Sequence, residues 1–135
     1  METKSLSEST ICCFGDSTTW GDNGCGAGGN DISWTSHLGA LLGGAVVENF
    51  GIKGSRIAIK ADRTDSFVER LDGIDDAADI YIVFGGVNDF SRNVPLGELG
   101  STDVHEFYGA LDYLIRTITA RSPQAKLVFM TPCKT

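Results

Sequence analysis

The stretch that decides the fold runs from Thr10 to Gly21 and reads TICCFGDSTTWG. Its apolar run, Ile11 to Phe14, stops at Gly15-Asp16-Ser17, which is how a buried parallel strand breaks into a loop at its carboxyl end. In open α/β sheets, ligands bind at that end of the strands. A serine held there by a glycine turn is exposed and lies near backbone amides that could stabilise an oxyanion. Ser17 is therefore the first candidate for a nucleophile, against the alternative that Asp16 and Ser17 are ordinary turn formers.

The composition is that of an ordinary globular protein. The chain has 135 residues, of which 41% are hydrophobic and 21% charged, and these fractions are typical of soluble domains. A chain of this length buries one core rather than two, so we expect a single domain over residues 1–135. The net charge of -7 argues against nucleic acid or an anionic membrane surface as a partner.

The N-terminal sequence METKSLSEST lacks an apolar core of signal-peptide length, and no later run approaches a membrane span. We therefore expect a soluble, cytoplasmic or otherwise non-exported chain.

Adjacent cysteines in a strand point to opposite faces, and no C-x-x-C spacing suggests zinc. The cysteines are expected to be free thiols in a reducing compartment, and we expect neither a metal site nor a cofactor. They are Cys12, Cys13, Cys25 and Cys133.

Alternating strands and helices follow the first strand. Apolar runs predict further strands at residues 45–51, 80–84 and 126–130, and helical spacing predicts helices at 34–42, within 57–71 and at 104–118. The run IYIVF at 80–84 is continuous and rich in β-branched side chains, which is typical of a central strand buried on both faces. The alternation implies right-handed crossovers and a parallel sheet covered on both sides.

Particular residues are candidates for the ends and faces of these helices. Asp31 or Ser33 can cap the helix at 34–42. Asp103 followed by Glu106 resembles a capping box at the start of the helix at 104–118. Within 57–71, apolar and charged positions separate into two helical faces. The charged face comprises Asp62, Arg63, Asp65, Glu69 and Arg70.

Three successive strands end in glycine turns with polar neighbours. These turns are Gly15-Asp16-Ser17, the segment from Gly51 to Gly54, and Gly86-Val87-Asn88-Asp89. A carboxamide such as that of Asn88, held at a strand end, can donate a hydrogen bond to a developing oxyanion. The alternative is that Asn88 and Asp89 only form an Asx-type turn. The glycine-rich segment 21–29 is expected to be a long loop, and it lacks the lysine and spacing of a phosphate loop.

With these three blocks the sequence resembles the SGNH (GDSL-type) hydrolase family over nearly its whole length. The resemblance implies a flavodoxin-like, three-layer α/β/α fold whose parallel strands lie in the order 2-1-3-4, with the fifth, edge strand absent. It also implies an ester-hydrolysing serine enzyme. Ser17, flanked by Asp16, would be the nucleophile. The backbone amides of Ser17 and Gly54 and the side chain of Asn88 would form the oxyanion hole.

The family also implies a base histidine in a D-x-x-H block after a fifth strand, whereas this sequence ends after the fourth. We therefore expect impaired activity of the 135-residue chain. His105, with Asp103 two residues before it, is a weaker candidate base, and His37 is weaker still, because geometry must come before pKa. The open edge of the fourth strand would invite self-association.

Three functions fit this pattern. The first is a serine hydrolase of small-molecule or carbohydrate esters, that is, an esterase, a lipase or a carbohydrate deacetylase. The second is a non-catalytic module that binds an acyl or carbohydrate group in the same pocket. The third is a flavodoxin-like nucleotide or flavin binder, which the acidic, lysine-poor first loop disfavours.

Overall fold

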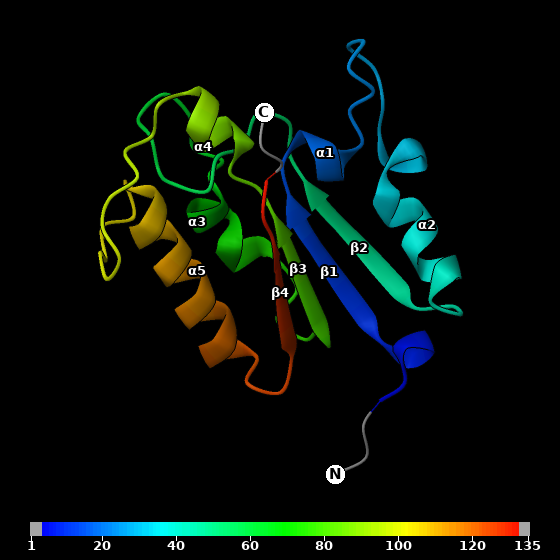
Figure 1. Cartoon of the computed structure of the whole chain (residues 1–135). Helices are drawn as coiled ribbons and strands as arrows, with labels where there is room; N and C mark the ends of the chain where they lie inside the picture. The colour runs from blue at the N-terminus through cyan, green and yellow to red at the C-terminus, as the bar shows by residue number, and fades with distance from the viewer. Residues whose placement is uncertain (1–3, 133–135) are drawn as a thin grey trace.

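The computed structural model describes residues 4–132, which form a parallel four-stranded sheet in the order β2-β1-β3-β4 (Figure 1). The predicted α/β fold and strand order are confirmed. In chain order the elements are η1 (Leu6–Glu8), β1 (Thr10–Gly15), α1 (Ser17–Trp20), η2 (Asn30–Ile32), α2 (Trp34–Leu41), β2 (Val46–Gly51), α3 (Phe67–Arg70), η3 (Leu71–Gly73), β3 (Ile80–Phe84), α4 (Val87–Ser91), α5 (Phe107–Arg121) and β4 (Lys126–Met130).

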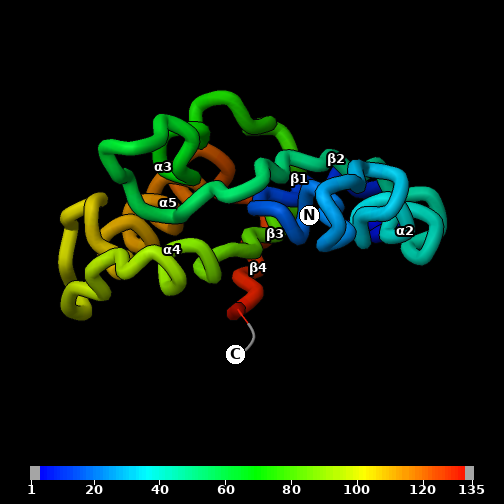
Figure 2. The backbone as a smooth tube through the Cα atoms, turned by 90° about the horizontal axis from the view of Figure 1, so that it is seen from above, coloured from blue at the N-terminus to red at the C-terminus, as the bar shows by residue number. Residues whose placement is uncertain are grey.

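Helices lie on both faces of the sheet, and β1 lies between them as its most buried strand. Alternate residues of a strand point to opposite faces, so Cys12 and Phe14 enter the core beneath α3 and α5. Ile11 and Cys13 enter the smaller core beneath α2. Seen from above, α2 lies on one side of the strands and α3 and α5 lie on the other (Figure 2).

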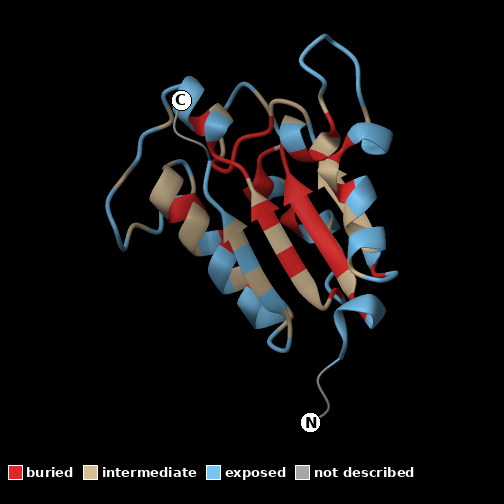
Figure 3. Ribbon diagram, turned by 45° about the vertical axis from the view of Figure 1, so that its right-hand side comes forward, coloured by how far each residue is buried: buried red, intermediate tan, exposed pale blue. Residues whose placement is uncertain are grey.

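The strand β3 departs from the expectation of burial on both faces. Tyr81 and Val83 are buried beneath α3 and α5, whereas Ile80, Ile82 and Phe84 are only partly buried. The reason is that α2 packs beside β1 and β2 and leaves the same face of β3 and β4 largely uncovered (Figure 3). On β4, Val128 and Met130 are 44% and 39% exposed. Burial on both faces therefore belongs to β1 rather than to β3.

The start of α2 matches the prediction. Ser33 is its N-cap, and the serine Oγ accepts a hydrogen bond from the Thr35 amide at 3.2 Å. A side-chain oxygen in this position satisfies one of the amides that a helix leaves without an internal partner. Of the two candidates, Ser33 rather than Asp31 caps the helix.

The capping box predicted for α5 is wrong. The helix begins at Phe107, three residues later than expected, and its N-cap Glu106 makes no side-chain capping bond. The Phe107 and Tyr108 amides instead donate to the carbonyls of Pro95 and Leu96, at 2.9 and 3.0 Å. Because the preceding loop supplies these backbone acceptors, no capping side chain is needed. Asp103 accepts from the His105 amide, and Glu106 accepts from Ser101 Oγ.

The two cysteines of β1 lie on opposite faces of the sheet, as predicted, and both are buried free thiols. Burial raises the pKa of the Cys13 thiol to about 12 and raises that of Cys12 as well. Cys25 is a free, exposed thiol, and Cys133 lies outside the described residues.

Within residues 4–132, no helix combines the length and the apolar character needed to cross a membrane.

Candidate functional site

Ser17 lies directly after the carboxyl end of β1, as the first residue of the short helix α1. The expected loop therefore starts with a helical turn, which Gly21 ends in a left-handed conformation. Asp16 is the N-cap, and its Oδ1 accepts a hydrogen bond from the Thr18 amide at 3.1 Å. The Ser17 amide belongs to the first turn of the helix, where amides have no partner within the helix.

Glycines at two strand ends let α1 lie against the sheet. A Cβ atom on Gly15 would lie 2.1 Å from Thr19 Oγ1, and one on Gly51 would lie 2.1 Å from the backbone nitrogen of Trp20. Neither distance is compatible with a side chain. The glycines that end β1 and β2 therefore let α1 pack against the end of β2.

The end of β2 supplies the second part of the site. Asn49 Nδ2 donates to the Thr19 carbonyl at 2.8 Å, and Asn49 Oδ1 accepts from the Gly51 amide at 2.9 Å. One side chain thus connects α1 to the last residue of β2. Gly54 lies within this turn at a φ of +77°, a conformation that L side chains rarely adopt, and a Cβ there would lie 2.3 Å from Arg63 Nη1.

Asn88, in α4 after β3, joins these two strand ends. Its Nδ2 donates to the Ser55 carbonyl at 3.0 Å and lies 3.5 Å from Asp16 Oδ2. The turns after β1, β2 and β3 therefore meet at one edge of the sheet. Among the described residues, the Ser17 and Gly54 amides donate no hydrogen bond, so both are available to an added acceptor.

Asp89 has a structural role that the sequence did not indicate. The interpretation as a local Asx-type turn is wrong for this residue, because its carboxylate reaches across to another segment. Its two oxygens accept hydrogen bonds from the Ile57 and Ala58 amides at 2.8 and 3.0 Å. The side chain is buried and burial raises its pKa, as it does for the buried Asp16. Asp89 thereby fixes α4, and with it Asn88, to the segment that follows Gly54.

Arg70 also departs from its prediction. The sequence pattern predicts it on the charged face of its helix, yet its guanidinium lies over the rings of Phe14 and Phe67. The signal was present in the sequence, because a residue three positions after Phe67 shares the face of that buried ring. Arg70 is held by hydrogen bonds to the Phe50 carbonyl and to the Gly15 carbonyl, both at 2.9 Å.

The two histidines lie on the surface. His105 pairs through Nδ1 with Asp103 Oδ1 at 2.9 Å, and the two side chains are 62% and 55% exposed. His37 lies exposed on α2. In the part of the chain that the structure describes, neither forms a hydrogen bond to Ser17, Asp16 or Asn88. The structure therefore brings together Ser17, Asp16, Gly54 and Asn88 but does not bring a histidine to them.

The described residues form no group of three or more His, Cys, Asp or Glu side chains that could hold a metal ion. Three glycine turns at the carboxyl edge of a parallel sheet are instead typical of an α/β protein that binds its ligand at that edge. The chain belongs to the GDSL-like Lipase/Acylhydrolase family, whose model matches residues 13–135. The resemblance to the SGNH (GDSL-type) hydrolases is therefore confirmed.

Solved structures agree with this family. A crystal structure 96% identical to the chain superposes with a TM-score of 0.95, covering 98% of this chain and 60% of that one. A protein from Lactobacillus plantarum is 31% identical, with a TM-score of 0.76 over 93% of this chain and 56% of that one. A possible lipase from Chitinophaga pinensis is 26% identical, with a TM-score of 0.74 over 93% of this chain and 49% of that one. The chain thus spans roughly half or slightly more of each structure's length. No curated protein matched it.

Proposed function

We propose that this chain carries the nucleophile and the oxyanion hole of a serine ester hydrolase. The observation that carries the proposal is the meeting of three strand ends, at which Asn88 Nδ2 lies 3.0 Å from the Ser55 carbonyl and 3.5 Å from Asp16 Oδ2. Membership of the lipase/acylhydrolase family supports ester bonds as the class of substrate.

In the proposed reaction, Ser17 Oγ forms a bond to the ester carbonyl carbon, and the electron pair of the C=O bond moves onto its oxygen. The Ser17 amide, the Gly54 amide and Asn88 Nδ2 donate hydrogen bonds to this oxyanion. When the tetrahedral intermediate collapses, the alcohol leaves and an acyl-serine forms, which water then hydrolyses. Loss of one oxyanion donor typically lowers turnover about 100-fold to 1000-fold.

The proton of Ser17 Oγ has to pass to a base. The role of His105 as this base stays a prediction. Its imidazole pairs with Asp103 on the surface. Without a base, an oxyanion hole retains a residual rate of about 1000-fold over water, so slow acylation is expected from this chain.

The lack of a histidine beside Ser17 in residues 4–132 favours a second candidate function. In that case the same edge of the sheet binds an acyl or carbohydrate group without breaking a bond. The two candidates differ in whether Ser17 reacts covalently.

Intact mass after exposure to an alkyl fluorophosphonate separates them. In the expected reaction Ser17 Oγ bonds to phosphorus, fluoride leaves, and the hydroxyl proton passes to solvent. We expect an adduct on the wild type and none on Ser17→Ala. Ser36→Ala, which removes an exposed serine of α2, serves as the matched control and is expected to react like the wild type. A folded wild type without an adduct would contradict an activated serine and favour the binding module.

A further inference from the structure

Arg70 occupies the centre of the network beneath the candidate site. It is the last residue of α3, and its guanidinium carbon lies 4.8 Å from the centroid of the Phe14 ring and 5.2 Å from that of Phe67. A cation over two aromatic faces is stabilised by the charge distribution of the rings. Arg70 is half-buried, and each of its three guanidinium nitrogens donates to a protein acceptor.

Four acceptors meet the guanidinium. Nη2 donates to the Gly15 carbonyl at 2.9 Å and to Ser55 Oγ at 3.0 Å. Nη1 donates to the Phe50 carbonyl at 2.9 Å, and Nε donates to the Asp65 carbonyl at 3.0 Å. Gly15 directly precedes the turn that holds the nucleophile, and Phe50 and Ser55 lie on either side of the turn that contains Gly54. A single side chain therefore ties the end of β1 to the chain that leaves β2.

The third strand end is reached through Ser55. Its carbonyl oxygen accepts the hydrogen bond from Asn88 Nδ2, and its hydroxyl donates to the Asp65 carbonyl at 2.6 Å. A shift of Ser55 would therefore move the acceptor that orients the Asn88 carboxamide. Arg70, Ser55 and Asn88 form a continuous chain of contacts from the half-buried cation to the proposed oxyanion donor.

The guanidinium keeps its charge despite this burial. Burial lowers the pKa of Arg70 to about 10, and the nearby carboxylates of Asp65 and Asp16 oppose that decrease. Arg70 is therefore protonated at neutral pH and has all of its N–H donors. A lysine would retain the charge but not the planar fork that reaches several fixed acceptors at once.

We propose that Arg70 is a positioning residue, which holds the Gly15, Phe50 and Ser55 backbones so that the donors on the three strand ends converge on one oxyanion. The inference rests on the proposed function, because it assigns a cause to the geometry of that oxyanion hole. A misplacement of about 1 Å in such a site can lower the rate about 100-fold. Arg70→Lys, which preserves charge and most of the volume, is therefore the informative variant.

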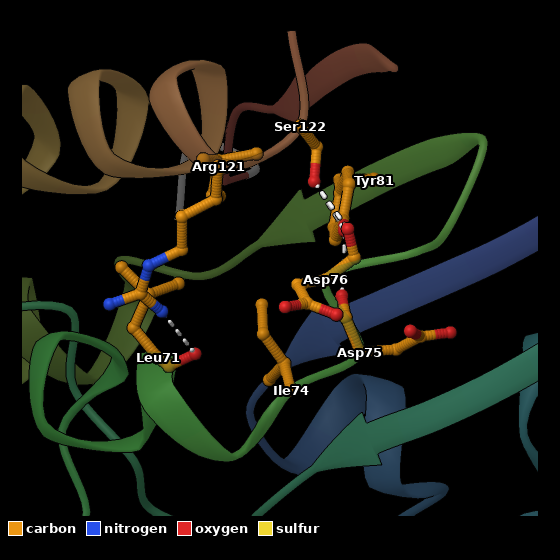
Figure 4. A pocket seen from close by; sticks show the side chains of 8 residues that line it. Leu71, Ile74, Asp75, Asp76, Tyr81, Arg121 and Ser122 are labelled. Carbon is orange, nitrogen blue, oxygen red and sulfur yellow. Dashed lines mark hydrogen bonds between the residues drawn. The ribbon is translucent and has the colours of Figure 1, made fainter. Parts of the chain in front are cut away.

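Arg121 offers a matched control at the opposite end of the sheet. Its Nη1 donates to the Leu71 carbonyl at 3.3 Å, and its Nη2 pairs with Asp72, so it also anchors the segment that follows α3. It lines a small hollow where the hydroxyls of Tyr81 and Ser122 lie 3.0 Å apart (Figure 4). Arg121→Lys weakens the contacts with Leu71 and Asp72 but leaves the four acceptors of Arg70 unchanged.

The first measurement is the rate of fluorophosphonate labelling at Ser17 as a function of probe concentration. We expect Arg70→Lys to lower the limiting labelling rate about 100-fold, with little change in the concentration that gives half of that rate. Arg121→Lys is expected to label like the wild type. Equal limiting rates for Arg70→Lys and the wild type would overturn the proposal, as would an equal loss in Arg121→Lys at comparable stability.

A second measurement does not depend on activity. In amide NMR spectra of ¹⁵N-labelled protein, we expect Arg70→Lys to move the Ser17 and Gly54 amide signals and the Asn88 side-chain signals more than Arg121→Lys does. If the wild type is not labelled but these signals move, the proposed catalysis fails and the positioning role stands. If the wild type is labelled but these signals stay in place, the positioning role fails and the proposed function stands.

Discussion

Replacing Asp89 tests whether one buried carboxylate holds α4 against the chain after Gly54. The side chain is 2% exposed, and its oxygens accept the Ile57 and Ala58 amides at 2.8 and 3.0 Å. Asp89→Asn preserves the shape but offers one acceptor and one N–H group, so one buried backbone amide loses its partner. Such a loss costs about 1–3 kcal/mol. Asp89→Ala leaves both amides without a partner, at about twice that cost by the same reasoning.

Urea unfolding followed by the fluorescence of Trp20 and Trp34 measures this cost. For small proteins the free energy of unfolding falls by about 1–3 kcal/mol per molar urea. A loss of about 2 kcal/mol therefore lowers the midpoint by about 1 M. Asp76→Asn removes an exposed carboxylate and is the matched control, with an expected change within about 0.5 kcal/mol. An Asp89→Asn midpoint equal to that of the wild type would refute the proposed anchoring.

Two further predictions concern β2. Gly51→Ala places a Cβ 2.1 Å from the Trp20 backbone nitrogen, whereas a Cβ at Gly73 meets no atom within 4 Å. We therefore expect Gly51→Ala to lower the free energy of unfolding by about 3 kcal/mol and Gly73→Ala, the control, to lower it little. Equal urea midpoints for the two variants would contradict this. The second prediction concerns Glu48, one of whose carboxylate oxygens is buried without a hydrogen-bond partner. Burial, together with Asp75, raises the pKa of Glu48 from 4.5 to about 7. Between these two values the folded state keeps a proton that the unfolded state has lost, so stability falls as pH rises through this interval. Glu48→Gln is expected to abolish that decline in urea midpoints between pH 4.5 and about pH 7. An unchanged decline would show that other groups cause it.

Arg70 and Asp89 show how the candidate site depends on contacts that the sequence does not reveal. Asp89 is buried and Arg70 is half-buried, and both side chains form hydrogen bonds with backbone groups that lie far away in the sequence. Arg70 donates to the Gly15 carbonyl, 55 positions earlier, and Asp89 accepts from the Ile57 amide, 32 positions earlier. The spacing from Phe67 indicates the face on which Arg70 lies, but the partners of both side chains follow from the docking of whole elements.

The sequence by itself determined the four strands, the glycine turns that end three of them, and the parallel sheet, because apolar runs and glycines act through local backbone geometry and burial. It also pointed to Ser17, Gly54 and Asn88, since residues that follow parallel strands meet at one edge of the sheet. Only the tertiary structure decided that β1 rather than β3 is the strand buried on both faces, and that α5 starts at Phe107. The physical reason is that helix packing and long-range hydrogen bonds set these features, and both depend on residues far apart in the chain.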